Sequence, residues 1–117
     1  MSRIQLKRVF DAASKRDGYR VLVDRIWPRG LRKEEVRIND WMKEIAPSTE
    51  LRKWFGHDPA RWEEFRRRYF AELRERLELV NRLRDIAQRG PLTLVYSAKD
   101  ENHNNAVALK EFLEERH

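Results

Sequence analysis

The chain has 117 residues with no cysteine, and its 26 Lys and Arg against 20 Asp and Glu give a formal net charge of +6 at pH 7. This length suits one domain with its own core, so we expect a single domain over residues 1–117. The lack of thiols excludes disulfides, thiolate metal ligands and cysteine nucleophiles. No segment has the apolar length of a signal peptide or a membrane span, so we expect a cytoplasmic protein without a membrane partner.

Two strands are predicted in the first part of the chain. Residues 3–10 place Ile4 and Leu6 between polar neighbours, which is typical of a half-exposed strand. Residues 19–26 form a Val-rich apolar run that is too short for a buried helix, which indicates a central strand. The segment 11–18 between them is expected to be a loop with at most a short helical turn.

The second strand is expected to end in the turn Trp27-Pro28-Arg29-Gly30, because proline lacks an amide donor and glycine accepts positive φ. The apolar spacing in residues 31–55 predicts two short helices that are separated at Pro47. Ser48 is predicted to cap the second of these helices.

A long amphipathic stripe then runs over residues 59–89. Asp58 is a favoured N-cap and Pro59 a favoured first helical residue, and apolar side chains follow three or four apart as far as Gly90. No residue near position 75 is a helix breaker by type. One continuous helix and two helices in phase therefore both remain open.

The chain ends with a third predicted strand at residues 92–96, a polar loop at 97–105 and an amphipathic helix at 106–115. Helices between the second and third strands imply that these strands run parallel. The order of elements predicts an α/β fold, a small three-layer open sheet that is mainly parallel, with helices on both faces.

Polar residues follow the second and third strands, where ligands gather at the edge of a parallel sheet. If these strands are neighbours, the segments 24–30 and 97–105 line one crevice. Arg25 and Arg29 would offer forked hydrogen-bond donors and Lys99 a point charge. We therefore predict a basic crevice that binds a small anionic ligand bearing a phosphate or a carboxylate.

A purely structural interpretation of the same residues stays open. Arg25 would then pair with Asp24 or Asp100, Arg29 would be solvated, and Trp27 would pack on the helices. The loop asparagines, Asn102, Asn104 and Asn105, are ordinary capping residues, although there are more of them beside His103 than a cap requires.

His57 and His103 are candidate acids or bases, since each lies near an aspartate in the sequence, Asp58 and Asp100. One Asp and one His are too few ligands for a metal site, so we predict neither a metal nor a cofactor. An acid or base role for His103 remains open. Ser97 lacks the glycine-flanked strained turn of serine hydrolases and is not predicted to be a nucleophile.

The long helix carries many arginines, but glutamates are interleaved with them, which indicates a solvated face of ion pairs. Nucleic-acid binding through the basic amino-terminal third, where residues 1–37 hold eleven Lys and Arg against five Asp and Glu, is kept as an alternative. A third interpretation is an interaction module without catalysis that assembles around Trp41, Trp54 and Trp62. The oligomeric state is not predicted.

Several segments together resemble a known family. Val-Asp-Arg-Ile-Trp-Pro-Arg-Gly at 23–30, the Trp-rich run at 41–55, Trp-Glu-Glu-Phe-Arg-Arg-Arg-Tyr at 62–69 and Leu-Val-Tyr-Ser-Ala-Lys-Asp at 94–100 resemble the YeaO-like branch of the domain-of-unknown-function 488 (DUF488) family. The resemblance implies a small three-layer α/β fold and a cytoplasmic protein without an established reaction. Other branches carry a cysteine near positions 103–105, and a cysteine-based activity would not transfer to this chain.

The resemblance also implies a set of characteristic polar positions, which overlaps the crevice predicted from the loops. The predicted ligand-binding residues are Arg25, Trp27, Arg29, Gly30, Ser97, Lys99, Asp100, His103, Asn104 and Asn105, and the secondary candidates are Lys43, Ser48, Arg52 and His57.

Overall fold

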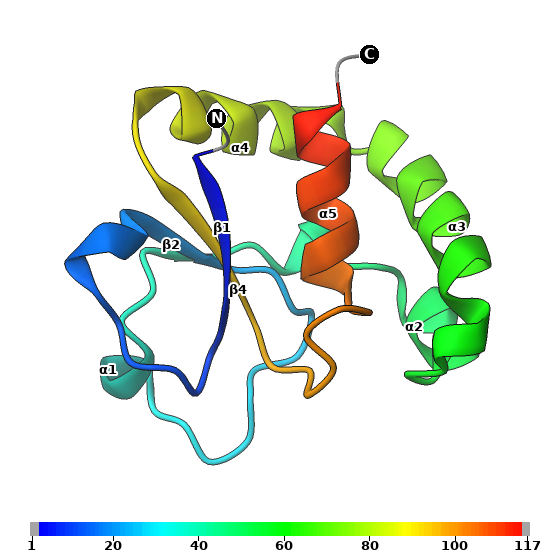
Figure 1. The fold of residues 1–117 in the computed structure, drawn as a ribbon, viewed down its shortest axis with the longest axis horizontal. Helices are drawn as coiled ribbons and strands as arrows, with labels where there is room; N and C mark the ends of the chain where they lie inside the picture. The colour runs from blue at the N-terminus through cyan, green and yellow to red at the C-terminus, as the bar shows by residue number, and fades with distance from the viewer. Residues whose placement is uncertain (1–2, 116–117) are drawn as a thin grey trace.

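A computed structural model describes residues 3–115, and it contains a four-stranded parallel sheet in the order β1-β4-β2-β3 (Figure 1). The strands are β1 (Ile4–Arg8), β2 (Tyr19–Leu22), β3 (Asp40–Trp41) and β4 (Leu92–Tyr96). The central strand β4 is buried along its whole length and aligns Leu94 with Leu6 on one side and Val21 on the other. The predicted α/β class and parallel sheet are confirmed, and the second and third predicted strands are neighbours.

The helices are α1 (Lys33–Val36), α2 (Thr49–Phe55), α3 (Trp62–Arg74), α4 (Leu77–Arg89) and α5 (Asn105–Glu114), with short 3₁₀ turns η1 (Lys15–Asp17), η2 (Lys43–Ile45) and η3 (Pro59–Arg61). The predicted cap at Ser48 is confirmed, since its side chain accepts a hydrogen bond from the Leu51 amide. Asp58 accepts one from the Ala60 amide, and so caps the 3₁₀ turn η3 that precedes α3. Of the three loop asparagines for which capping was the structural interpretation, Asn104 caps α5 by accepting from the Val107 amide.

The prediction of a short helix between residues 31 and 47 is confirmed only for the four residues of α1, which Arg37 ends in a left-handed conformation with φ 53°. The chain then returns to the sheet as β3, because Asn39 exchanges hydrogen bonds with the Arg20 backbone and Trp41 pairs with Leu22. The apolar spacing that suggested a helix belongs instead to a strand edge and a 3₁₀ turn.

The stripe over residues 59–89 is divided into two helices by Glu75 and Arg76. Their amides bond to carbonyls three residues back, Glu72 and Leu73, which tightens the last turn of α3. Leu77, where the apolar stripe would continue, is 49% exposed. After the break α4 lies across the end of the sheet, whereas α3 packs on α2 and α5 (Figure 1). Packing, rather than a helix-breaking residue, sets this break.

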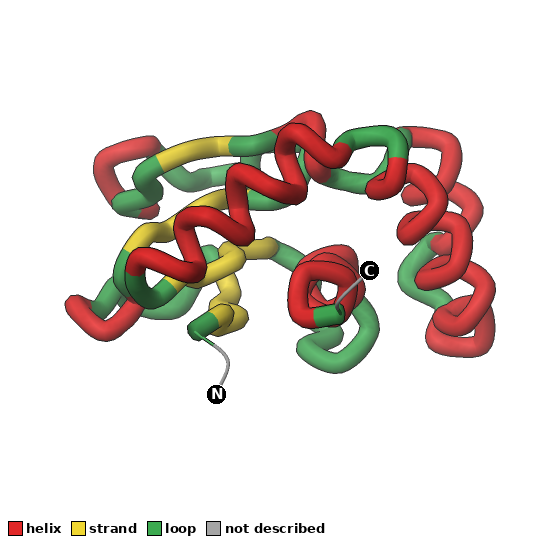
Figure 2. Tube along the Cα trace, turned by 90° about the horizontal axis from the view of Figure 1, so that it is seen from above, coloured by secondary structure: helices red, strands yellow, loops and turns green. Residues whose placement is uncertain are grey.

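Strand alternation divides the core between the two faces of the sheet. Val21, Leu92 and Leu94 belong to the larger core under α2, α3, α4 and α5, and Leu22 and Val95 belong to a smaller one under α1. Figure 2 shows α5 end-on beside the strands and α4 crossing over them. Within residues 3–115, no helix combines the length and the apolar composition that a membrane crossing requires.

Candidate functional site

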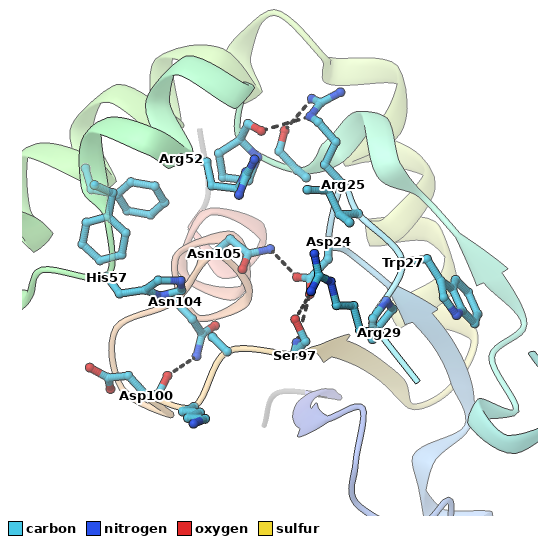
Figure 3. Close-up of a pocket in the computed structure, with 18 residues that line it drawn as sticks. Asp24, Arg25, Trp27, Arg29, Arg52, His57, Ser97, Asp100, Asn104 and Asn105 are labelled. Atoms are coloured by element: carbon cyan, nitrogen blue, oxygen red, sulfur yellow. Dashed lines mark hydrogen bonds between the residues drawn. The ribbon is translucent and has the colours of Figure 1, made fainter. Parts of the chain in front are cut away.

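A pocket of about 660 Å³ lies at the carboxyl ends of β2 and β4 (Figure 3). Segments that are distant in sequence meet there: the loop after β2, the segment before α2 with α2 itself, the turn before α3 with α3 itself, and the loop between β4 and α5. The lining residues are Asp24, Arg25, Ile26, Trp27, Pro28, Arg29, Ala46, Pro47, Arg52, Phe55, His57, Phe65, Ser97, Ala98, Lys99, Asp100, Asn104 and Asn105. Arg29 and Lys99, which the predicted crevice requires on the same edge of the sheet, both line it.

Asp24 is the centre of the polar floor of this pocket, which we define as Asp24, Ser97 and Asn105. Its Oδ2 accepts hydrogen bonds from Ser97, at 3.0 Å from the amide and 2.7 Å from the hydroxyl. Its Oδ1 accepts the Asn105 side-chain amide at 3.2 Å, and that amide also donates to the Val23 carbonyl at 3.0 Å (Figure 3). The carboxylate therefore ties the ends of two strands to the start of α5.

Asp24 belongs to the segment 24–30 that was predicted to line the crevice, but its sequence position suggested only a partner for Arg25 and not a ligand-binding residue. The available signal was its position, since an acidic residue directly after a buried parallel strand lies at the edge where ligands gather. The contacts to Ser97 and Asn105 join residues 73 and 81 positions apart, so they depend on the tertiary arrangement.

The rim of the pocket carries three exposed cations, which we call the rim cations: Arg29, Arg52 and Lys99. None of the three side chains makes a hydrogen bond or an ion pair with another residue in the described chain, 3–115. They come from the loop after β2, from α2 and from the loop after β4. Their guanidinium and ammonium groups are therefore available for a partner from outside the chain.

Arg25 differs from the rim cations. Its Nε donates to the Pro47 carbonyl and its Nη2 to the Ala46 carbonyl, both at 3.2 Å. It pairs with neither of the aspartates considered from the sequence, because its guanidinium is directed at the segment before α2 (Figure 3). Arg25 therefore fixes one wall of the pocket, and its Nε and Nη2 atoms are used in doing so.

Trp27 combines a packing role with a place in the pocket wall. Its indole Nε1 donates to the Leu31 carbonyl at 2.7 Å, and its ring meets the Trp41 ring edge-on with centroids 5.3 Å apart. This packing belongs to the smaller core, and the partner ring lies on β3 rather than on the helices that the structural interpretation named. Gly30 has φ 80°, which suits the turn, and it is not among the pocket-lining residues.

An apolar wall faces the polar floor. Phe55 and Phe65 stack with centroids 4.3 Å apart, and both are buried. Next to them His57 has a φ of 57°, directly after Gly56 at 52°. A left-handed conformation costs a non-glycine residue about 1–2 kcal/mol. This backbone, uncommon for a residue other than glycine, places His57 in the pocket lining.

His103 lies outside the pocket, although its partner Asp100 lines it. The His103 Nδ1 is 2.9 Å from Asp100 Oδ2, and the imidazole meets the Trp62 ring edge-on at 5.4 Å. The amide of Asn102 and the side chain of His103 hold the pKa of Asp100 below its ordinary value. The pair therefore orders the loop, and Asn104 adds a side-chain bond to the Asp100 carbonyl at 2.9 Å.

Two secondary candidates also lie elsewhere. The Lys43 ammonium sits 5.0 Å from the centroid of the Trp41 ring, and Ser48 caps α2 while its hydroxyl donates to Glu72 at 2.6 Å. Neither lines the pocket, whereas Arg52 and His57 do. Among the described residues, no group of three or more His, Asp or Glu side chains is placed to hold a metal ion.

The fold and the site define a parallel α/β protein with a pocket at the carboxyl edge of its sheet. The chain belongs to DUF488-N3i, described as the inactive DUF488-N3 subclade, whose family model matches residues 3–117. It is 50% identical over 110 residues to the uncharacterized protein YeaO of Escherichia coli K12, covering 94% of this chain and 96% of that one. It is 40% identical over 115 residues to the uncharacterized protein Rv3073c of Mycobacterium tuberculosis H37Rv, covering 98% and 97%. The resemblance to the DUF488 family is confirmed, and no solved structure gives a significant match.

Proposed function

We propose that this protein binds a small anionic organic ligand in the pocket at the carboxyl ends of β2 and β4. The observation that carries the proposal is the set of rim cations, Arg29, Arg52 and Lys99, which have no partner among residues 3–115. Cations that serve structure are normally paired, as Arg66 is with Glu63 at 3.1 Å. Three unpaired cations around one pocket instead favour an external phosphate or carboxylate.

The remaining features of the pocket suit such a ligand. Its lining holds four cations, Arg25 and the rim cations, against two acids, Asp24 and Asp100. Hydrogen bonds from the protein satisfy much of the charge on both acids. The volume of about 660 Å³ lies within the range of small-molecule pockets, and the stacked Phe55 and Phe65 offer an apolar surface for the carbon skeleton.

We favour binding without catalysis at this site. The Ser97 hydroxyl donates to Asp24 rather than to a histidine, and His103 lies outside the pocket. No pair of residues there has the nucleophile and histidine geometry that acyl transfer requires. The description of the subclade as inactive agrees with a role in binding.

Calorimetric titration with phenyl phosphate tests the proposal, because this probe joins an anion to an apolar ring. Arg52→Ala and Lys99→Ala should each weaken binding about tenfold or more, as expected for loss of a charge-assisted hydrogen bond. Lys53→Ala is the matched control, since Lys53 is the next residue of α2 and does not line the pocket. Equal affinity in all four proteins, or no binding by the wild type at millimolar probe, would reject the proposed site.

The nucleic-acid alternative has less support. In the amino-terminal third, Lys7 and Arg20 pair with Asp17 at 3.1 and 2.6 Å. On α3, Arg66 and Arg68 pair with glutamates at 3.1 and 2.8 Å. These cations are held by the protein itself. A salt series with generic DNA and RNA addresses the alternative, because phosphate contacts make affinity fall steeply with ionic strength.

The interaction-module alternative also has less support. Trp41 donates its indole Nε1 to the Asp24 carbonyl at 2.7 Å, and Trp62 stacks on Phe65 with centroids 5.6 Å apart. Trp54 lies beneath the guanidinium of Arg68, 4.3 Å from its ring centroid. Packing within the chain therefore accounts for the tryptophans that this alternative invoked.

A further inference from the structure

We infer that the ligand carries hydrogen-bond donors, hydroxyl or ammonium, beside its anionic group, and that the polar floor of Asp24, Ser97 and Asn105 accepts them. This inference rests on the proposed binding site and specifies the chemical class of its occupant. The class is a short phosphate ester or carboxylate that bears hydroxyl or amino groups on its carbon skeleton.

The side-chain donors of the polar floor are all used within the protein. Ser97 has one hydroxyl hydrogen, and it is directed at Asp24 Oδ2 over 2.7 Å. Asn105 has two amide hydrogens, which go to the Val23 carbonyl and to Asp24 Oδ1. Both of those partners are acceptors, so the Asn105 nitrogen has to face them and its oxygen has to face away. The floor thus has no side-chain donor left.

What remains on the floor is capacity to accept hydrogen bonds. The Asp24 carboxylate accepts three hydrogen bonds and has room for a further one at Oδ1. The Ser97 oxygen keeps lone pairs, and the Asn105 side-chain oxygen accepts nothing from the described residues. Three acceptor groups, from the segments after β2 and β4 and from the first residue of α5, therefore gather in one pocket lining (Figure 3).

The rim has the opposite chemistry. Arginine and lysine side chains carry donors and no acceptor, and the rim cations have no partner within residues 3–115. An anionic group suits the rim and would be repelled by Asp24 at the floor. A ligand without donors would leave the floor acceptors facing carbon, which costs binding free energy. The geometry therefore orients a ligand with its anion at the rim and its donors at the floor.

Three phosphate esters of equal chain length test this inference by calorimetry at pH 8: n-propyl phosphate, glycerol 3-phosphate and 3-aminopropyl phosphate. They share the anionic group and differ in donors, which are absent, hydroxyl or ammonium. We expect glycerol 3-phosphate or 3-aminopropyl phosphate to bind at least about tenfold more tightly than n-propyl phosphate. The tighter of these two identifies the donor as hydroxyl or ammonium.

Asp24→Asn should abolish the preference for the donor-bearing esters over n-propyl phosphate. Binding of n-propyl phosphate itself should be kept or strengthened, because the variant removes the negative charge of the floor. Ser97→Ala is a second variant, which keeps Asp24 and should narrow the preference, and circular dichroism checks that both variants fold. The comparison of the three esters on the wild type needs no variant.

Equal affinity for all three esters, with Arg52→Ala weakening each of them, would overturn the inference and leave the anion site standing. A preference that persists unchanged in folded Asp24→Asn would also overturn it. Failure of the wild type to bind any of the three would remove both the inference and the proposed function.

Discussion

Two clusters of cations lie beside the same sheet, and they differ in how their charges are satisfied. In the first, Arg20 and Asp17 are buried with side chains about 5% exposed, and they are joined at 2.6 Å. Lys7 binds the other oxygen of Asp17 at 3.1 Å, and the other two nitrogens of Arg20, Nη2 and Nε, donate to the carbonyls of Val36 and Arg37. The second cluster, the rim cations, is exposed and unpartnered within residues 3–115.

The difference shows how the same residue types serve structure in one place and are free for recognition in another. A buried guanidinium needs every donor satisfied, because an uncompensated charge in the interior is costly. An exposed guanidinium at a pocket rim is solvated in the free protein and can exchange water for a ligand. The buried cluster should therefore govern stability, and the rim cations should govern binding.

The largest effect on stability is expected from Asp17→Ala, which leaves Arg20 buried without its carboxylate. Loss of one member of a buried pair costs about 3–5 kcal/mol. Urea unfolding at pH 7 measures the difference, with Glu34→Ala as the control because Glu34 is exposed and lies on the nearby helix α1. A loss below about 1 kcal/mol in Asp17→Ala would show that Arg20 is satisfied without Asp17.

A smaller effect is expected on how the free energy of unfolding depends on pH, and it should be larger for the buried cluster than for the pocket. Burial by itself raises the pKa of Asp17, but hydrogen bonds from the Ser14 amide, Lys7 and Arg20 outweigh it and hold the pKa below its ordinary 3.8. A carboxyl whose pKa is lowered by folding stabilises the protein above its unfolded-state pKa, and this stabilisation is lost as the pH falls through the folded-state pKa. The free energy of unfolding should therefore decrease as the pH falls below about 4.

Urea unfolding from pH 5 to pH 2.5 measures this dependence. In Asp17→Asn the free energy of unfolding should depend less steeply on pH than in the wild type, by at most about 1.4 kcal/mol per pH unit for one carboxyl. Asp100→Asn, at the pocket, should flatten it less, because Asp100 is 32% exposed and solvent screens its contacts. Equal flattening by both variants would contradict the expectation that the buried carboxylate of Asp17 contributes more to stability than the more open carboxylate of Asp100.

The sequence predicted the overall arrangement of the pocket, because that arrangement follows from general rules of parallel sheets. The loops after β2 and β4 lie at one edge, and the capping roles of Ser48, Asp58 and Asn104 follow from residue type and position. These features depend on backbone geometry, which local sequence largely determines.

The features that the sequence did not predict depend on which side chains meet. The polar floor requires Ser97 and Asn105, which belong to other elements, to lie beside Asp24, and no spacing rule in the sequence predicts that contact. The strand β3 is too short to produce a periodic pattern, and the break at Glu75 arises from how α3 and α4 pack. The side chain of His103 was placed in the site by its neighbours in sequence, whereas its ring packs on Trp62 outside the pocket.

The smallest effects on stability should come from the rim cations. Arg29→Ala, Arg52→Ala and Lys99→Ala should each change the free energy of unfolding by less than about 0.5 kcal/mol, because these side chains are exposed and release no protein partner. Arg25→Ala is the contrasting variant in the same pocket, and it should cost about 1–2 kcal/mol because the carbonyls of Ala46 and Pro47 lose their donors. Urea unfolding of all four, without ligand, makes the comparison. If Arg52→Ala lowered the free energy of unfolding as much as Arg25→Ala, the Arg52 side chain would have a structural partner. It would then not be available to a ligand, and the proposed anion site depends on that availability.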